Sequence, residues 1–165
     1  AALSEAAGRI QSMMLVYDRL YRSEDFREVS AKQYLDELYQ EICRQFGPPP
    51  GIRMEGRFEE ILLDSGLLIP IGMVMNELVT NAFKYAFPGE RSGSIRVTLA
   101  RAGETSICLT VEDDGVGIPE DFDLESAEGF GFLLVRALAQ QVRGTVECRR
   151  GGGSTFRFTL PLGGS

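Results

Sequence analysis

Three consecutive prolines between two glycines, from Gly47 to Gly51, place the strongest constraint on how this chain can fold. Proline has no amide hydrogen to donate and disfavours helical backbone in the residue before it, so neither a helix nor a central strand can pass through this segment. The segment therefore divides the 165 residues into an N-terminal part, 1–46, and a C-terminal part, 47–165, which we expect to be separate domains.

The N-terminal part has the hydrophobic spacing of two helices. Apolar residues recur at alternating steps of three and four from Leu3 to Leu20, as on one face of an amphipathic helix. A second helix is expected from Ser30 to Phe46, because Ser30 and Gln33 match a capping box. Its apolar seam is Ala31, Leu35, Leu38 and Ile42. The short connection favours a helical hairpin, which either packs on its own domain or forms a dimeric bundle with a second copy.

The C-terminal part alternates strand and helix patterns. The expected strands are Ile52–Glu55, Phe58–Leu63, Ser94–Ala100, Ser106–Glu112, Thr145–Arg149 and Ser154–Leu160, and the expected helices are Pro70–Ala86, with Pro70 in its first turn, and Phe132–Val142. Strands that are mostly adjacent in sequence, with helices between pairs, predict a two-layer α/β sandwich with a mixed sheet and helices on one face. The N-terminal helical hairpin would precede this sandwich.

The composition excludes several kinds of chemistry. The sequence has no histidine, so this chain alone cannot build a Ser-His-Asp relay, an imidazole zinc site or a phosphohistidine. Its net charge of −7 disfavours nonspecific binding to nucleic acid or anionic lipid. Cys43, Cys108 and Cys148 are widely spaced and odd in number, so we expect buried thiols in a reducing compartment.

No apolar run approaches the roughly 20 residues that a membrane-spanning helix needs. We therefore expect no membrane contact by this chain and a cytoplasmic location, even where a full-length parent is attached to a membrane.

The predicted helix at 70–86 carries polar groups along one face. Glu77, Asn81, Lys84 and Tyr85 fall at i, i+4, i+7 and i+8. An amide oxygen can bind Mg²⁺, an ammonium can neutralise phosphate oxygens, and a carboxylate can orient water or accept a proton. A solvated polar face has the same spacing, so the pattern alone leaves both interpretations open.

Glycine-containing turns follow this helix. Asp113 ends an alternating strand and precedes Gly115 and Gly117, where the carboxylate can accept a hydrogen bond from an exocyclic amine and the glycines permit close approach of a flat ligand. Gly129 and Gly131 open a helix whose free amides can bind an anion. The stretch GGGSTF precedes the last strand. Each motif by itself is also common in simple turns.

In this order, the motifs resemble the ATP-binding domain, the Bergerat or GHKL fold, of histidine kinases, type II topoisomerases, MutL proteins and the ninety-kilodalton heat-shock chaperone. Within that superfamily, NELVTNAFKYAFP and the preceding LLIPIGMVM are similar to sensor histidine kinases related to the HWE group. Asn76 stands where the HWE signature has histidine, and the chain has no tryptophan, so the resemblance is to the sister family. It extends to RIQSMMLVYDRLYRSEDFREVSAKQYL, which is similar to the second dimerisation helix, and covers nearly the whole chain.

The resemblance implies ATP and Mg²⁺ as ligands. It assigns Asn81 to Mg²⁺, Lys84 and Tyr85 to the phosphates and the ribose region, and Asp113 to the adenine amino group. Glu77 matches the general base of the hydrolysing relatives. The other implied contacts are Gly115 and Gly117 in the adenine pocket, Gly129, Gly131, Phe132, Leu133 and Leu134 over the phosphates, and Thr155 beneath the adenine near Asp113.

The implied reaction transfers the γ-phosphoryl group of ATP to a histidine on a first dimerisation helix, expected before residue 1, and then to an aspartate of a response regulator. The resemblance also implies a homodimer in the full-length protein. Between the glycine motifs, the short acidic stretch IPEDFDLESAE, which we call the lid (118–128), is expected to turn its carboxylates outward, away from the triphosphate.

Other classes of protein fit part of these observations. A degenerate kinase that serves as a phosphotransfer scaffold would keep the fold and lose the nucleotide site. An anti-sigma-type serine kinase would use the same ATP fold without a histidine of its own. A freestanding ATPase of the topoisomerase type would hydrolyse ATP through Glu77.

Overall fold

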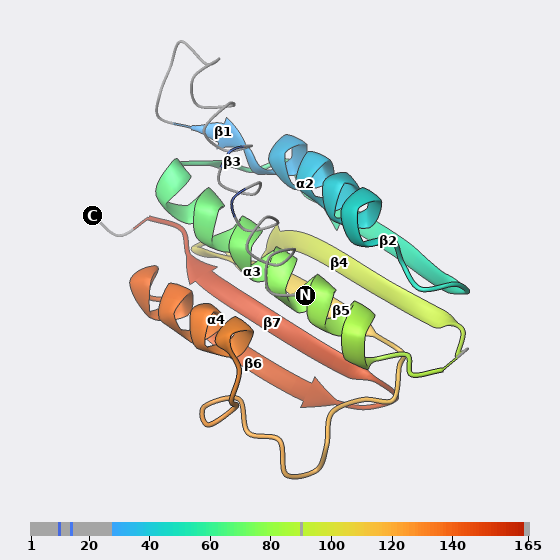
Figure 1. Cartoon of the computed structure of the whole chain (residues 1–165). Coiled ribbons are helices and arrows are strands. Elements are labelled where there is room, and N and C mark those ends of the chain that lie inside the picture. The colour runs from blue at the N-terminus through green and yellow to red at the C-terminus, as the bar shows by residue number, and fades with distance from the viewer. Residues whose placement is uncertain (1–9, 11–13, 15–27, 90, 164–165) are drawn as a thin grey trace.

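The computed structural model describes residues 10, 14, 28–89 and 91–163. The first predicted helix, Leu3 to Leu20, lies outside these residues except for Ile10 and Met14. The elements in chain order are β1 (Val29–Ser30), α2 (Ala31–Phe46), β2 (Ile52–Phe58), β3 (Leu62–Leu63), α3 (Ser65–Tyr85), β4 (Gly93–Arg101), β5 (Ser106–Asp113), α4 (Phe130–Gln141), β6 (Thr145–Arg150) and β7 (Ser154–Pro161) (Figure 1).

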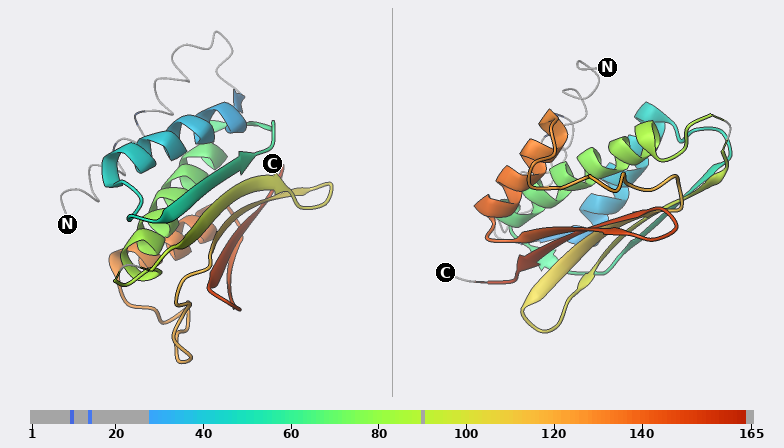
Figure 2. Two further views of the ribbon diagram at one scale, coloured as in Figure 1. Left: turned by 90° about the vertical axis from the view of Figure 1, so that its right-hand side faces the viewer. Right: turned by 90° about the horizontal axis from the view of Figure 1, so that it is seen from below.

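A five-stranded mixed sheet forms one layer, in the order β2-β4-β5-β7-β6. Strands β2 and β4 are parallel, and the other neighbours are antiparallel. Helices α2, α3 and α4 lie side by side over one face of this sheet, as the two side views in Figure 2 show. Strands β1 and β3 pair separately at the end of the helical layer. This arrangement confirms the predicted two-layer α/β sandwich with helices on one face.

Helix α3 is the central element of the helical layer. It packs against α2, α4 and the sheet, so nearly every side chain from Leu68 to Thr80 is buried. By length and composition, this helix of 21 residues could cross a membrane. The sequence has no uninterrupted apolar run of that length, so no such helix was expected. However, 72% of its apolar stretch is buried inside the protein, and burial on all sides also explains why a core helix is so apolar.

Helix α2 packs against α3 of the same chain. The Ser30 hydroxyl caps the helix by accepting a hydrogen bond from the Gln33 amide at 3.1 Å, as the capping pattern predicts. The predicted seam is buried, and it belongs to the same hydrophobic core as α3. Of the two interpretations of the seam, the structure therefore supports packing on the chain's own core. The division into domains at 47–51 stays a prediction.

Three expectations differ from the structure. Helix α3 begins at Ser65 because the Asp64 carboxylate caps it through the Leu67 amide at 3.2 Å, so Pro70 lies in the second turn rather than the first. Strand β2 continues through Gly56 to Phe58 because it pairs with β4 along its whole length, and Gly56 leaves room for the Tyr39 ring, which would lie 3.2 Å from an added Cβ. The predicted strand Phe58–Leu63 is wrong, since Phe58 belongs to β2 and only Leu62–Leu63 forms the separate strand β3.

The three cysteines are free thiols. Cys108 is buried as expected, whereas Cys43 and Cys148 are half-buried. The expectation of three buried thiols was therefore wrong for two of them.

The packing of α2 on α3 can be tested at Gly72. An added Cβ there would lie 2.0 Å from the Tyr34 hydroxyl oxygen and 3.0 Å from Leu38. We expect Gly72→Ala to lower the free energy of unfolding by about 1–3 kcal/mol through overpacking, measured by urea denaturation. The control is Gly66→Ala on the same helix, where the new Cβ would lie 2.9 Å from the exposed Asp64 cap and would meet no core side chain, so only the helix cap is affected. Equal stability of the two variants would contradict this packing.

Candidate functional site

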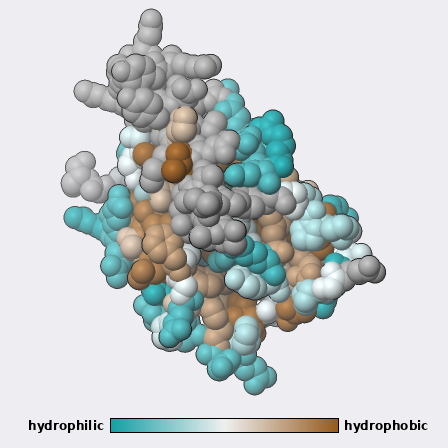
Figure 3. Space-filling view, viewed as in Figure 1, coloured by the Kyte–Doolittle hydropathy of each residue, from teal (hydrophilic) through white to brown (hydrophobic). Residues whose placement is uncertain are grey.

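A cavity of about 540 Å³ opens between α3, the lid and the start of α4. On the helix-bearing face of the protein, apolar side chains gather around α4 and the space beside α3, with hydrophilic residues around them (Figure 3). The sequence-predicted residues that line the cavity are Glu77, Asn81, Lys84, Tyr85, Asp113, Gly117, Gly129, Gly131 and Phe132. Four predicted residues do not line it, namely Gly115, Leu133, Leu134 and Thr155.

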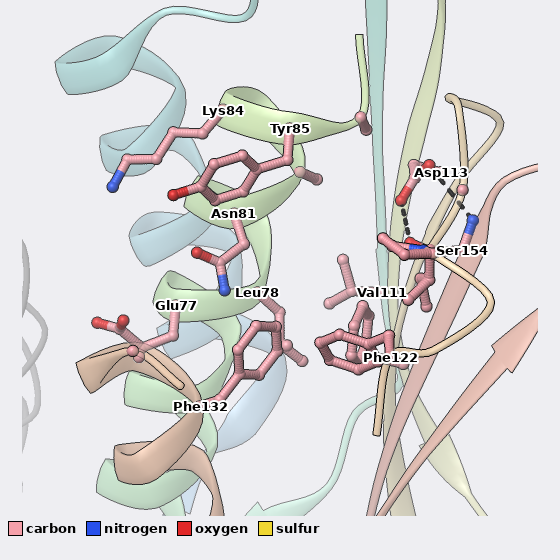
Figure 4. Close-up of a pocket in the computed structure, with 18 of the residues that line it drawn as sticks. Glu77, Leu78, Asn81, Lys84, Tyr85, Val111, Asp113, Phe122, Phe132 and Ser154 are labelled. Carbon is pink, nitrogen blue, oxygen red and sulfur yellow. Dashed lines mark hydrogen bonds between the residues drawn. The ribbon is translucent and has the colours of Figure 1, made fainter. Parts of the chain in front are cut away.

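The polar face of α3 runs from the buried interior to the mouth of the cavity. Glu77 is only 4% exposed, Asn81 is half-buried, and Lys84 and Tyr85 are exposed. Figure 4 shows Asn81 between Glu77 and Tyr85, with the Lys84 ammonium directed away from Asp113. Because a solvated face would not bury a carboxylate, the structure favours the functional interpretation of this spacing over the solvated one.

Asp113 joins the end of β5 to the start of β7. One carboxylate oxygen, Oδ1, accepts hydrogen bonds from the Gly115 amide at 2.9 Å and the Ser154 amide at 3.3 Å, and Oδ2 accepts one from the Ser154 hydroxyl. An ionised carboxylate has about four acceptor positions. Asp113 is therefore held firmly in place and still has acceptor capacity for an amine inside the cavity.

The neighbouring Asp114 stabilises the turn after β5 and does not line the cavity. Its carboxylate accepts hydrogen bonds from the Ser94 amide at 2.7 Å and the Ser94 hydroxyl at 2.8 Å, which ties the end of β5 to β4. The Ser94 amide is the main reason that the pKa of Asp114 lies below its usual value. Asp114 thus stabilises the turn, whereas Asp113 lines the cavity.

Ser154, and not Thr155, occupies the position predicted beside Asp113. In the β5–β7 register, Ser154 lies opposite Asp113 and Thr155 lies opposite Glu112, and neighbouring side chains on a strand point to opposite faces. The sequence contains the signal for this correction. Phe158 and Leu160, at even positions of the same strand, are fully buried residues of the core side, and strict alternation places Ser154 on that side too.

The two glycines after Asp113 act in different ways. An added Cβ at Gly115 would lie 2.2 Å from the Ala86 carbonyl oxygen, so this glycine allows the turn to pass the end of α3 and does not line the cavity. The Val116 amide then donates to the same Ala86 oxygen at 2.8 Å. Gly117 lines the cavity with a φ of +78°, a backbone conformation that favours glycine.

The start of α4 presents backbone amides to the cavity. Gly129, with a φ of +117°, precedes the helix without a side-chain cap, and residues 130–132 form the first turn, whose amides point along the helix axis toward its N-terminal end. The Leu133 amide already donates to the Gly129 carbonyl at 3.2 Å. Leu133 is exposed and Leu134 packs against the core, so the part of α4 that lines the cavity ends at Phe132, two residues before the predicted limit.

Gly131 keeps α3 and α4 close together at the cavity. An added Cβ at this position would lie 2.7 Å from Glu77 Oε2 and 3.7 Å from Asn81 Nδ2. A side chain at Gly131 would therefore fill the space that joins the buried carboxylate to the helix start.

The aromatic wall of the cavity consists of Phe132, which was predicted, and of Phe122 and Phe156, which were not. Phe122 in the lid contacts Phe132 edge-on, with ring centroids 5.3 Å apart, and Phe132 stacks on Phe156 at 5.8 Å. Figure 4 shows Phe122 and Phe132 between α3 and the sheet. Alternation in β7 could have identified Phe156, but no local pattern predicts where a lid residue such as Phe122 packs.

The acidic side chains of the lid are all exposed. They are Glu120, Asp121, Asp123, Glu125 and Glu128. The first four lie outside the cavity lining, in agreement with the expected outward orientation, whereas Glu128 lines the cavity and departs from it.

Comparisons with known proteins identify the class to which this fold and cavity belong. Residues 66–164 match the family of histidine kinase-, DNA gyrase B- and HSP90-like ATPases, and residues 1–46 match a histidine kinase family. The solved histidine kinase domain of the Erythrobacter litoralis EL346 blue-light activated histidine kinase superposes with a TM-score of 0.87 at 24% identity, covering 96% of this chain and 75% of that one.

Curated relatives agree with this class. The chain is 30% identical over 166 residues to the sensor histidine kinase PdtaS of Mycobacterium tuberculosis, covering 98% of this chain and 33% of that protein. It is 36% identical over 93 residues to blue-light-activated histidine kinase 2 of Erythrobacter litoralis, covering 56% of this chain and 27% of that protein. The chain belongs to the family of histidine kinase-, DNA gyrase B- and HSP90-like ATPases. It spans about a third of the length of the curated relatives that it matches.

The assignment of Ser154 can be tested against its neighbour. We expect Ser154→Ala to weaken ATP binding about five- to tenfold, because it removes the hydroxyl that orients Asp113, and a hydrogen bond to a charged group is worth about 1.5 kcal/mol. Thr155→Ala is the matched control and should leave the affinity unchanged, since Thr155 does not line the cavity. Isothermal titration calorimetry measures both, and a larger effect of Thr155→Ala would overturn the assignment.

Proposed function

We propose that this chain is the catalytic ATP-binding region of a two-component sensor histidine kinase. It would transfer the γ-phosphoryl group of ATP to a histidine outside this chain, and a response regulator aspartate would then receive the group. Homodimerisation of the full-length protein and a cytoplasmic location belong to the same proposal. They are supported by the family of the chain and by the histidine kinase match at residues 1–46.

The observation that carries this proposal is the convergence of three kinds of group on one cavity. A buried carboxylate and an amide come from α3 (Glu77 and Asn81), an anchored carboxylate comes from the strand ends (Asp113), and backbone amides come from the start of α4. Asp113 suits the amino group of a base, and helix amides suit phosphate oxygens. The cavity is within the usual range for a site that binds a small molecule.

The cavity also suits a nucleotide-bound magnesium ion. The described residues contain no group of three or more histidine, cysteine or acidic side chains that could hold a metal by themselves. Mg²⁺ commonly uses one or two protein ligands together with substrate phosphates and water, and the Asn81 side chain supplies an amide oxygen inside the cavity. When bound, Mg²⁺ would neutralise charge on the phosphates. Gly131 leaves the space beside Asn81 free.

In the proposed reaction, the bond between the γ-phosphorus and the ADP oxygen breaks, and a bond from the phosphorus to an imidazole nitrogen forms. The chain contributes positioning and charge neutralisation. The amides of residues 130–132 hold phosphate oxygens, and Lys84 adds positive charge at the cavity mouth. Glu77 can accept a proton from the attacking group, because its carboxylate reaches the space beside the α4 start.

The adenine assignment can be tested with Asp113→Asn. The substitution replaces a carboxylate oxygen by an amide NH₂ group, which is a donor and would face the adenine amino group, also a donor. We therefore expect Mg-ATP affinity to fall about tenfold or more in a calorimetric titration. Asp121→Asn, an exposed lid carboxylate outside the cavity lining, is the control and should bind normally. Unchanged affinity of Asp113→Asn would show that this carboxylate does not hold the base.

The phosphotransfer itself requires an acceptor, since this chain has no histidine. Incubated with γ-labelled ATP, the chain alone should acquire no phosphohistidine, whereas a longer form that includes the upstream sequence should acquire acid-labile label. Asn81→Ala in the longer form should abolish the labelling.

Acid-stable label on a serine of a partner would favour the serine kinase instead. ATP turnover by the chain alone, abolished by Glu77→Gln, would favour the freestanding ATPase, and a failure to bind Mg-ATP would favour the scaffold.

A further inference from the structure

We propose that Arg136 and Arg150 are positioning residues that clamp the lid against the aromatic wall. The clamp is made entirely by groups of this chain. Its consequence for ATP affinity rests on the proposed function above.

Arg136 holds the second half of the lid. Its Nη1 atom donates to the Leu124 carbonyl at 2.7 Å and to the Ala127 carbonyl at 3.1 Å. Arg136 belongs to the second turn of α4, so it links the lid to the helix whose first turn faces the cavity. Hydrogen bonds from a charged donor are stronger than those between neutral groups, and carbonyl acceptors make the contact independent of the lid side chains.

Arg150 holds the first half of the lid from the opposite side. It is the last residue of β6, and its Nη2 atom donates to the Phe122 carbonyl at 2.9 Å. Three lid carbonyls are thus bound by two arginines from different elements of the rigid sandwich.

The lid is also organised between these two attachments. The Asp123 carboxylate accepts hydrogen bonds from the Ser126 hydroxyl at 2.8 Å and the Glu125 amide at 3.1 Å, and these bonds, the Ser126 hydroxyl first, hold the pKa of Asp123 below its usual value. Leu124 is only 9% exposed. The middle of the lid therefore has a defined turn and one buried apolar anchor.

The clamp connects to the cavity through Phe122. Its carbonyl is held by Arg150, and its ring contacts Phe132 in the first turn of α4 and Phe156 in β7. Moving the lid would displace this ring and remove one wall of the cavity. We therefore infer that the arginines preserve the shape of the site in the free protein, which lowers the ordering cost of ligand binding.

A second hollow of about 540 Å³ lies behind the lid, between residues 122–125 and the side chains of Val146, Cys148 and Arg150. Because this space is not filled by side chains, the lid lacks close packing on that side and depends more on the arginine hydrogen bonds. The half-buried Cys148 thiol lines this hollow, so its reactivity can report on lid opening.

The experiment compares Arg136→Gln and Arg150→Gln with Arg149→Gln. Arg149 is the matched control because it precedes Arg150 on β6, pairs with Glu147, and undergoes the same change of charge without a lid contact. In the nucleotide-free protein, alkylation of Cys148 is followed by mass spectrometry relative to Cys43, a half-buried thiol on α2. We expect Arg136→Gln to react about fivefold faster or more at Cys148, since local opening becomes easier when charged hydrogen bonds are lost. The increase in Arg150→Gln should be smaller, because burial raises the pKa of the Cys148 thiol, the Arg150 guanidinium opposes this rise, and its loss disfavours the reactive thiolate.

Mg-ATP binding is the second measurement. We expect about five- to tenfold weaker binding by each clamp variant, with Arg149→Gln unchanged and partial recovery in Arg136→Lys, which retains one charged donor group. In a longer, phosphorylation-competent form, KM for ATP should rise while kcat stays close to its original value.

The two measurements separate the possible failures. Cys148 reactivity equal to that of Arg149→Gln would overturn the clamp, whatever the affinity for ATP. If the unmodified protein fails to bind Mg-ATP, the proposed function is overturned, and the alkylation rates still test the clamp. If Arg136→Gln or Arg150→Gln has a lowered thermal stability, Arg136→Lys takes its place. Faster alkylation of Cys148 in Arg136→Lys than in Arg149→Gln supports the clamp, and an equal rate contradicts it.

Discussion

The enclosure of α3 is the constraint on which the rest of the structure depends. This helix lies between α2 and α4 and above the sheet, so it has almost no solvated face from Leu68 to Thr80. Polar side chains on such a helix need a cavity or an internal partner, because burial without one is costly. The cavity beside Glu77 and Asn81 supplies that environment, and the helix in turn supplies the wall that the cavity needs. The packing of α3 in the core consequently determines the geometry of the cavity as well.

The second requirement is the register between β5 and β7. With Asp113 opposite Ser154, a single serine supplies two donors to the carboxylate, and the Gly115 amide supplies a third. A shift by one residue would turn Ser154 to the other face of the sheet. Phe158, fully buried four residues further along the strand and on the same face, makes such a shift unfavourable. The hydrophobic core therefore fixes the orientation of a polar group that does not belong to it.

Much of the fold follows from local sequence. Alternation identified β4, β5, β6 and β7 nearly to the residue, and helical periodicity identified α2 and α4. Errors arose where a long-range contact outweighed a local signal. Pro70 resembles a helix start, yet the Asp64 cap begins the helix one turn earlier, and Gly56 resembles a strand break until Tyr39 packs over it. For the candidate site, helical spacing alone identified the four polar α3 residues that line the cavity. The position of Ser154 required the strand alternation, and the aromatic lid residue Phe122 required the tertiary structure.

The attachment of α2 has a mechanical consequence. The Ala31 amide donates to the Ile61 carbonyl at 2.8 Å, Val29 pairs with Leu63, and Tyr34 fills the space above Gly72. These contacts attach the start of α2 both to the segment that leads into α3 and to α3 itself, although the prolines of residues 48–50 separate the helices in sequence. A displacement of the start of α2 would therefore be transmitted to the helix that forms the cavity wall through these packed contacts, without passing along the polyproline segment.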